Sequence, residues 1–200
     1  MSARDVIIVA SGGANTASLQ FALQRLGARA EVSADPVRVG AATHVILPGV
    51  GAAGDAMSRL RERSLAALIP TLPQPVLGIC LGMQLLHDAS DEGDTRCLAV
   101  LPGRARRLQA AERRPVPHMG WNTLEGRRES PLLEGIAEGA YAYFVHSYAL
   151  DPGAATLART CYGTEFSACV GWRNFYGTQF HPERSAGVGA RLLGNFLALA

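Results

Sequence analysis

Lysine is absent from this chain of 200 residues, and all 19 of its basic side chains are arginine. They are balanced by 17 acidic residues, and the resulting net charge of +2 is too small to indicate a nucleic acid partner. No run approaches the roughly 18 apolar residues that a membrane span needs. The N-terminal apolar stretch is also too short for a secretory signal. We therefore expect neither membrane nor nucleic acid as a partner.

Cysteine is scarce, and its four positions show no disulfide or metal-binding spacing: Cys80, Cys97, Cys161 and Cys169. Free thiols of this kind are typical of a reducing compartment, so we expect a cytoplasmic protein. The glycine-rich segment 49–54 is not followed by the G-K-[ST] of a phosphate-binding loop. We expect no metal site and no cofactor.

The arginines gather in three clusters on either side of the segment PVPHMGWN, at 104–107, 113–114 and 127–128. Two interpretations remain open. The arginines form a solvated rim, or they form a docking face for a partner or a phosphorylated substrate.

The first half of the chain alternates buried-type strands with helical patterns. The strand DVIIVA precedes a helix with Leu19 and Leu23 on one face and a glycine stop at Gly27. The next strands are ARAEVS, THVILPG and PVLGI, and helical patterns cover about 54–69 and CLGMQLLHDAS. This order predicts a mainly parallel sheet with helices on both faces.

After about residue 98 the chain becomes rich in β-type segments that are separated by Gly, Pro and Asn: WNTL, YAYFVHSYAL, ATLARTCYG, FSACVGW and FYGTQF. A final helix is expected over 186–199. Because no linker or repeat interrupts the sequence, we expect one domain over 1–200.

The segment PVLGICLGMQLL predicts a nucleophile elbow, in which a buried strand runs into a helix at Cys80. Gly78 and Gly82 flank the cysteine, and so tight a turn needs nearly side-chain-free neighbours. The N–H groups of the helix start favour the thiolate, which is the attacking species. The alternative is a packed structural cysteine between glycines, so the motif needs a base elsewhere in the chain.

The segment HPE supplies the base and its orienting carboxylate, His181 and Glu183. Pro182 favours an extended conformation at His181, and residues two apart in an extended segment point to the same side. A thiolate–imidazolium pair that a carboxylate orients follows the logic of hydrolytic triads. His118 and His146 lie in Gly-rich and aromatic-rich segments but lack an acidic neighbour at orienting distance.

The loop PGVG, after the strand HVIL, is a candidate oxyanion loop. A tetrahedral intermediate needs backbone N–H donors, of which we expect one from Leu81 and a second from Val50 or Gly51. The alternative is a glycine-rich connection without a function.

PGVG, GICLGMQ and HPE, in this order over nearly the whole chain, resemble the class I (triad) glutamine amidotransferases. The resemblance implies a flavodoxin-like three-layer α/β fold with a mainly parallel central sheet and a β-rich C-terminal half. It also implies that glutamine is hydrolysed to glutamate and ammonia through a γ-glutamyl thioester on Cys80. The residues that it implies for holding glutamine are Gly49, Gly51, Gln84, Ser147 and Tyr148.

PHMGWN and YFVHSY further resemble the glutaminase subunits of imidazole glycerol phosphate synthase, an enzyme of histidine biosynthesis. The chain ends shortly after the triad, so the expected partner is a separate (β/α)₈-barrel cyclase subunit that receives the ammonia in a heterodimer. Interface residues implied by the resemblance are Asn15, Met119, Trp121, Tyr143 and Arg184. The family usually has lysine where Arg184 stands, and the alternative for Trp121 is a strand core residue.

The resemblance leaves three alternatives: a glutaminase of another synthase, such as that for anthranilate or pyridoxal phosphate; a γ-glutamyl peptidase with the same nucleophile; and a non-catalytic binding subunit. We also expect activity to depend on the partner, with the 49–51 loop as the switch, because a free glutaminase would waste glutamine.

Overall fold

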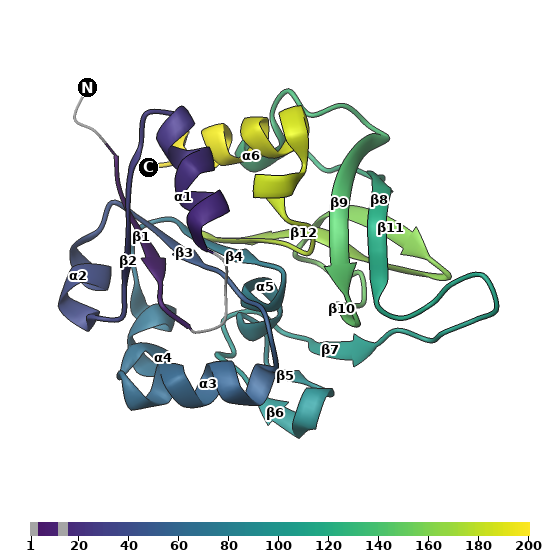
Figure 1. The fold of residues 1–200 in the computed structure, drawn as a ribbon, viewed down its shortest axis with the longest axis horizontal. Helices are drawn as coiled ribbons and strands as arrows, with labels where there is room; N and C mark the ends of the chain where they lie inside the picture. Colours follow the sequence, from purple (N-terminus) through teal and green to yellow (C-terminus); the bar gives the residue numbers. More distant parts are fainter. Residues whose placement is uncertain (1–3, 12–15) are drawn as a thin grey trace.

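The computed structural model describes residues 4–11 and 16–200. Its centre is a seven-stranded sheet in the order β11-β12-β13-β4-β3-β1-β2 (Figure 1). Five neighbouring strands are parallel: β1 (Asp5–Val9), β2 (Arg29–Ser33), β3 (His44–Leu47), β4 (Val76–Ile79) and β13 (Phe175–Thr178). The antiparallel strands β12 (Thr164–Trp172) and β11 (Thr156–Tyr162) extend one edge.

Helices cover both faces of this sheet, because the strand side chains alternate between two cores. Val6 and Ile8 pack in the core under α1 (Thr16–Arg25) and α6 (Ala186–Ala198). Ile7 and Val9 face the opposite core with the remaining helices: α2 (Pro36–Ala41), α3 (Ala53–Glu62), α4 (Leu65–Leu68) and α5 (Leu81–Leu85). Figure 1 shows α1 and α6 above the sheet and α3 and α4 below it. The three-layer flavodoxin-like fold is confirmed.

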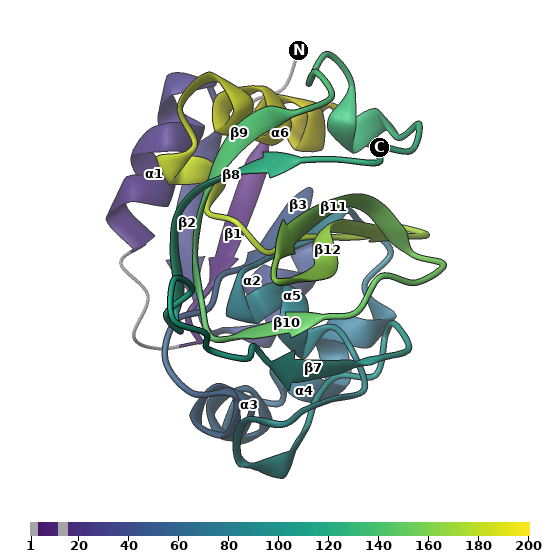
Figure 2. The same ribbon diagram turned by 90° about the vertical axis from the view of Figure 1, so that its right-hand side faces the viewer.

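Two small sheets between residues 89 and 150 complete the fold (Figure 2). One is a hairpin of β8 (His118–Leu124) and β9 (Ala140–His146). The other has the order β10-β7-β5-β6 and consists of β5 (Ala89–Ser90), β6 (Thr95–Arg96), β7 (Arg104–Arg107) and β10 (Tyr148–Leu150). Short 3-10 helices are η1 (Ile69–Thr71), η2 (Glu92–Asp94), η3 (Pro131–Leu133) and η4 (Pro182–Arg184).

Two of the predicted helices are wrong in extent. The helix over 54–69 is interrupted at Ser64, whose φ of 59° lies in the left-handed region. The helix after Cys80 ends at Leu85, because the N–H groups of Leu86 and His87 bond to carbonyls three residues back and the chain turns into β5. The strands of the first half, α1 and α6 are confirmed, whereas the sequence did not predict α2, which Asp35 caps through the N–H of Val37.

No helix in the described part of the chain is both long and apolar enough to cross a membrane.

Candidate active site

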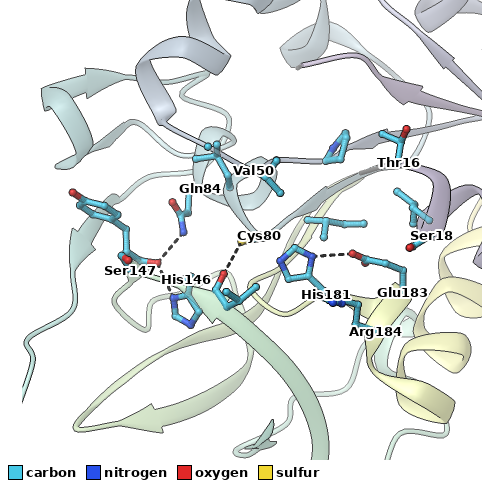
Figure 3. Close-up of a pocket in the computed structure, with 18 of the residues that line it drawn as sticks. Thr16, Ser18, Val50, Cys80, Gln84, His146, Ser147, His181, Glu183 and Arg184 are labelled. Carbon is cyan, nitrogen blue, oxygen red and sulfur yellow. Dashed lines mark hydrogen bonds and ion pairs between the residues drawn. The ribbon is translucent and has the colours of Figure 1, made fainter. Parts of the chain in front are cut away.

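The loops that follow β3, β4 and β13 carry the three expected motifs, and all three loops leave the sheet at its carboxyl edge. Strand β4 lies between β3 and β13. Cys80 therefore stands between the PGVG loop on one side and His181 on the other. Together they line a cavity of about 440 Å³ (Figure 3). Parallel strand order brings together segments that lie far apart in the sequence.

Cys80 occupies a strained turn, with φ of 54° and ψ of −111°. Its N–H donates to the carbonyl oxygen of Thr178 at 2.7 Å, which ties the turn to β13. Gly78 and Gly82 are needed for close packing: a Cβ on Gly78 would lie 2.7 Å from the backbone of Gly82, and one on Gly82 would collide with the carbonyl of Leu47. The positive φ itself falls on the cysteine, as in a nucleophile elbow.

His181 and Glu183 form the expected pair, with His181 Nδ1 2.9 Å from Glu183 Oε1. Their side chains are only 9% and 12% exposed. The predicted route to this contact is wrong, because only His181 is extended and Glu183 lies in the 3-10 turn η4. That turn, rather than strand alternation, brings the carboxylate back onto the ring.

The imidazole of His181 lies between Glu183 and Cys80 (Figure 3). Burial lowers the pKa of His181, but hydrogen bonds and charges from Cys80 and Glu183 outweigh it and raise the pKa to about 10. Within the described residues, Nε2 of this ring forms no hydrogen bond of normal geometry. The site therefore favours an imidazolium facing the sulfur of Cys80.

The residues expected to bind glutamine and its oxyanion all line the same cavity: Gly49, Val50, Gly51, Leu81, Gln84, Ser147 and Tyr148. A Cβ on Gly49 would lie 2.5 Å from the N of Gly82, and Gly51 has a φ of +90°. Both positions therefore require glycine. Val50 between them lines the cavity and is 39% exposed.

The sequence did not reveal three further groups of the site. Glu92 lines the cavity, and its Oε2 accepts the N–H of Ala53 at 2.7 Å. Gln179 Nε2 and the carbonyl oxygen of Val145 each lie 3.6 Å from Cys80 Sγ. Glu92 sits in the acidic run DEGD, which is typical of a solvated loop, and nothing in its sequence signals the cavity. Gln179 could have been noted as the residue two before His181.

The chain matches the family model of glutamine amidotransferase class-I over residues 8–199. It belongs to this family. An imidazole glycerol phosphate synthase subunit HisH from Xylella fastidiosa is 51% identical over 195 residues, covering 98% of each chain. The corresponding subunit HisH 1 from Vibrio vulnificus is 46% identical over 205 residues, covering 100% of each.

Two solved structures have a similar fold. A protein described as a glutamine amidotransferase has a TM-score of 0.75 and 21% identity, with 96% of this chain and 97% of the other covered. A chain from the structure of PurLQS from Thermotoga maritima has a TM-score of 0.74 at 17% identity, with 99% of each chain covered. At such identities the likeness concerns the fold.

Beside the cavity of this amidotransferase, the β8–β9 hairpin exposes an aromatic surface, which we call the hairpin face: Met119, Trp121, Tyr141, Tyr143 and Arg184. Met119 is 64% and Trp121 52% exposed, so Trp121 is not a core residue. The rings of Trp121 and Tyr143 are 5.9 Å apart, and the Arg184 guanidinium lies 5.2 Å from the Tyr143 ring centre. Asn15, the remaining expected interface residue, lies outside the described residues.

Several clustered arginines bind groups of their own chain. Arg104 pairs with Asp91 and Asp94, and Arg106 with Asp151. Arg127 and Arg128 donate to backbone carbonyls of residues 133, 154 and 156. These contacts favour the rim interpretation for the arginines at 104, 106, 127 and 128.

Replacing Glu183 with glutamine is expected to lower kcat for glutamine hydrolysis by roughly 10²–10⁴-fold. The amide lacks the charge that holds the imidazolium of His181, and it can present an N–H to Nδ1 and so impose the wrong tautomer. Glutamate release under saturating glutamine measures the effect. Glu165→Gln, on the exposed end of an ion pair with Arg159, is the matched control and should keep full activity. Equal rates for both variants would exclude Glu183 as the orienting group.

Proposed function

We propose that this chain is the glutaminase subunit of an imidazole glycerol phosphate synthase, hydrolysing glutamine and supplying the ammonia for histidine biosynthesis. The observation that carries this proposal is the placement of Cys80, His181 and Glu183 around one cavity in a member of the amidotransferase family. The full-length relatives named as subunits of that synthase support the choice of pathway. We further propose that residues 1–200 act as one glutaminase domain in the cytoplasm.

In the proposed mechanism, the Cys80 thiolate attacks the side-chain carbonyl carbon of glutamine. The N–H groups of Leu81 and of Val50 or Gly51 hold the oxyanion of the tetrahedral intermediate. The imidazolium of His181 gives its proton to the leaving nitrogen, so ammonia departs and a γ-glutamyl thioester remains. His181 then takes a proton from water, which attacks the thioester and releases glutamate and the thiolate.

The cavity offers complementary groups for the rest of the substrate. Gln84 Nε2 is already engaged by the carbonyl of Tyr148 and by Gln179, which leaves its Oε1 for the ligand. Backbone groups of Gly49, Gly51, Ser147 and Tyr148 would complete the binding of glutamine. The Glu92 carboxylate supplies the negative charge on the cavity wall that suits the α-ammonium group.

We propose the hairpin face as the docking surface for the partner, which is a (β/α)₈-barrel cyclase that receives the ammonia. Large aromatic side chains and arginine are the residues that anchor interfaces. This surface is also connected to the triad by hydrogen bonds. The N–H of His181 donates to the carbonyl of Tyr143 at 3.0 Å, and the N–H of Tyr143 donates to Ser185 Oγ at 2.9 Å. Docking on Tyr143 would therefore act directly on the base.

Glutamine hydrolysis by the chain alone and with a purified barrel cyclase and its nucleotide substrate tests this function. We expect co-purification and a large stimulation of hydrolysis, because the 49–51 loop is proposed to complete the oxyanion hole only in the complex. Full activity of the isolated chain would contradict the switch. Failure of any barrel cyclase to bind or to receive ammonia would contradict the assignment.

Trp121→Ala is expected to weaken the complex about 30-fold or more, because truncating a buried interface tryptophan typically costs about 2 kcal/mol or more. Trp172→Ala is the matched control. Trp172 is 49% exposed but lies beside Phe175 at the amino end of β13, on the edge of the sheet opposite the cavity. Titration of labelled cyclase gives both dissociation constants. Equal losses for the two variants would exclude the hairpin face.

A further inference from the structure

Seven residues form a continuous series of buried or half-buried polar groups between the hairpin and the nucleophile, and most of them have no role in the mechanism above. In order they are Asn122, His118, His146, the carbonyl of Tyr148, Gln84, Gln179 and Cys80. The successive distances are 3.4, 3.1, 2.9, 2.8, 3.0 and 3.6 Å. The series starts on β8, whose neighbouring side chains Met119 and Trp121 belong to the hairpin face.

The position of the hydrogen on each of the two histidine rings is fixed by the groups on either side of the pair, the carbonyl of Tyr148 and the amide of Asn122. His146 Nδ1 faces the carbonyl oxygen of Tyr148, which only accepts, so this nitrogen carries the hydrogen. His146 Nε2 is then an acceptor, and His118 Nδ1 must donate to it. His118 Nε2 is left as an acceptor for Asn122 Nδ2. The same nitrogen of Asn122 also donates to the carbonyl of Cys161 at 3.0 Å, which fixes the orientation of the amide.

The two glutamine amides are fixed in the same way. Gln84 Nε2 donates one hydrogen to the carbonyl of Tyr148 and the other to Gln179 Oε1. Because the oxygen of Gln179 faces Gln84, its nitrogen faces Cys80 Sγ. The carbonyl of Tyr148 is the junction, since it accepts from both His146 and Gln84 with its two lone pairs.

Packing keeps both imidazoles neutral. The His118 ring stacks between Tyr162, at 4.1 Å, and Phe144, at 5.1 Å. Burial lowers the pKa of His118 to about 4, and burial lowers that of His146 to about 3. At neutral pH each ring therefore has one donor and one acceptor, as the series requires.

We propose that His118, His146 and Gln179 are positioning residues for Cys80 and Gln84. From Asn122 to the carbonyl of Tyr148, each hydrogen bond is donated toward the nucleophile. Gln84 then donates both to that carbonyl and to Gln179, and so turns the N–H of Gln179 toward the sulfur. This inference rests on the proposed role of Cys80 as nucleophile.

The chemical effect follows from the two groups that compete for the sulfur. The carbonyl oxygen of Val145 can only accept and therefore suits a protonated thiol. The N–H of Gln179 can only donate and therefore stabilises the thiolate. Any displacement of the hairpin moves Val145 and Asn122 together, because both lie on its paired strands. The series thus gives the hairpin a direct effect on how reactive the sulfur is.

Alkylation of Cys80 by iodoacetamide tests this without glutamine turnover. Cys161 is exposed on β11 and serves as the internal reference in each molecule, with both modified peptides quantified by mass spectrometry. Gln179→Met keeps the volume but removes the N–H, and at pH 7 we expect the Cys80 to Cys161 rate ratio to fall about 10-fold or more. An unchanged ratio would overturn the proposal.

Two variants of His146 distinguish a positioning role from a packing role. His146→Phe keeps an aromatic ring but removes both nitrogens, so the alkylation ratio should fall and KM for glutamine should rise as Gln84 loosens. His146→Asn places a side-chain amide donor near Nδ1 and should recover at least part of both. If His146→Asn behaves like His146→Phe while His146→Phe folds normally, the donor is irrelevant and the proposal fails.

The unaltered protein provides a measurement that does not depend on the folding of variants. Nitrogen NMR of the histidines should show His118 and His146 as neutral Nδ1–H tautomers from pH 5 to 8. An Nε2–H tautomer in either ring would overturn the series. Rapid Cys80 alkylation together with an absence of glutamine hydrolysis would reject the proposed function but leave this inference standing.

Discussion

Replacing Cys80 with serine is expected to abolish glutamine hydrolysis, lowering kcat by at least about 10⁴-fold. A serine hydroxyl is far less acidic than a thiol, and the attacking group in the proposed mechanism is a thiolate. The strained φ of 54° at this position and the bond from its N–H to Thr178 place the side-chain atom correctly in either case. The loss would therefore be chemical rather than structural.

The comparison needs a variant that removes a thiol elsewhere. Cys161→Ser removes an exposed thiol on β11 and should leave kcat unchanged. Glutamate release gives the rates, calorimetry with glutamine shows whether Cys80→Ser still binds substrate, and acid quenching with labelled glutamine traps the thioester in the unaltered chain only. Retention of substantial hydrolysis by Cys80→Ser would show that Cys80 is not the nucleophile and that the cavity uses another chemistry.

The triad was predictable because its cues are local and independent of the fold. Each motif can be recognised from a few consecutive residues: the glycines two residues on either side of Cys80, and the tripeptide that begins at His181. Their meeting in space follows from strand order, since β4 lies between β3 and β13. Sequence alternation predicted a parallel sheet but not which strands are neighbours.

Other features escaped sequence analysis because they depend on contacts between distant segments. The helix after Cys80 ends at Leu85 although its residues favour helix, because the chain must turn into β5. Glu183 reaches His181 through a 3-10 turn that Pro182 begins. Gln179 and Glu92 acquire their positions from the sulfur of Cys80 and the N–H of Ala53. The periodicity of a sequence does not predict such contacts between distant residues.

Gly82, one of the two glycines that flank Cys80, is the site of the second large effect. Gly82→Ala is expected to lower the free energy of unfolding by about 3 kcal/mol or more. Gly82 lies in α5 without a positive φ, so helix propensity alone would favour alanine by about 1 kcal/mol. Its Cβ would however collide with the carbonyl oxygen of Leu47 in β3. Leu47 pairs with Gly78 of β4, so the backbone of Leu47 cannot move away from the added Cβ without opening the sheet.

Gly194→Ala is the matched control, because Gly194 lies within α6 and a Cβ there would meet nothing within 4 Å. This variant should be as stable as the unaltered chain, or more stable by up to about 1 kcal/mol. Urea unfolding followed by circular dichroism gives both free energies. In a chain of this size, about 3 kcal/mol corresponds to a fall in Tm of roughly 6–12 °C. If both variants unfold at or above the wild-type midpoint, close packing of α5 on β3 is not what requires glycine beside the nucleophile.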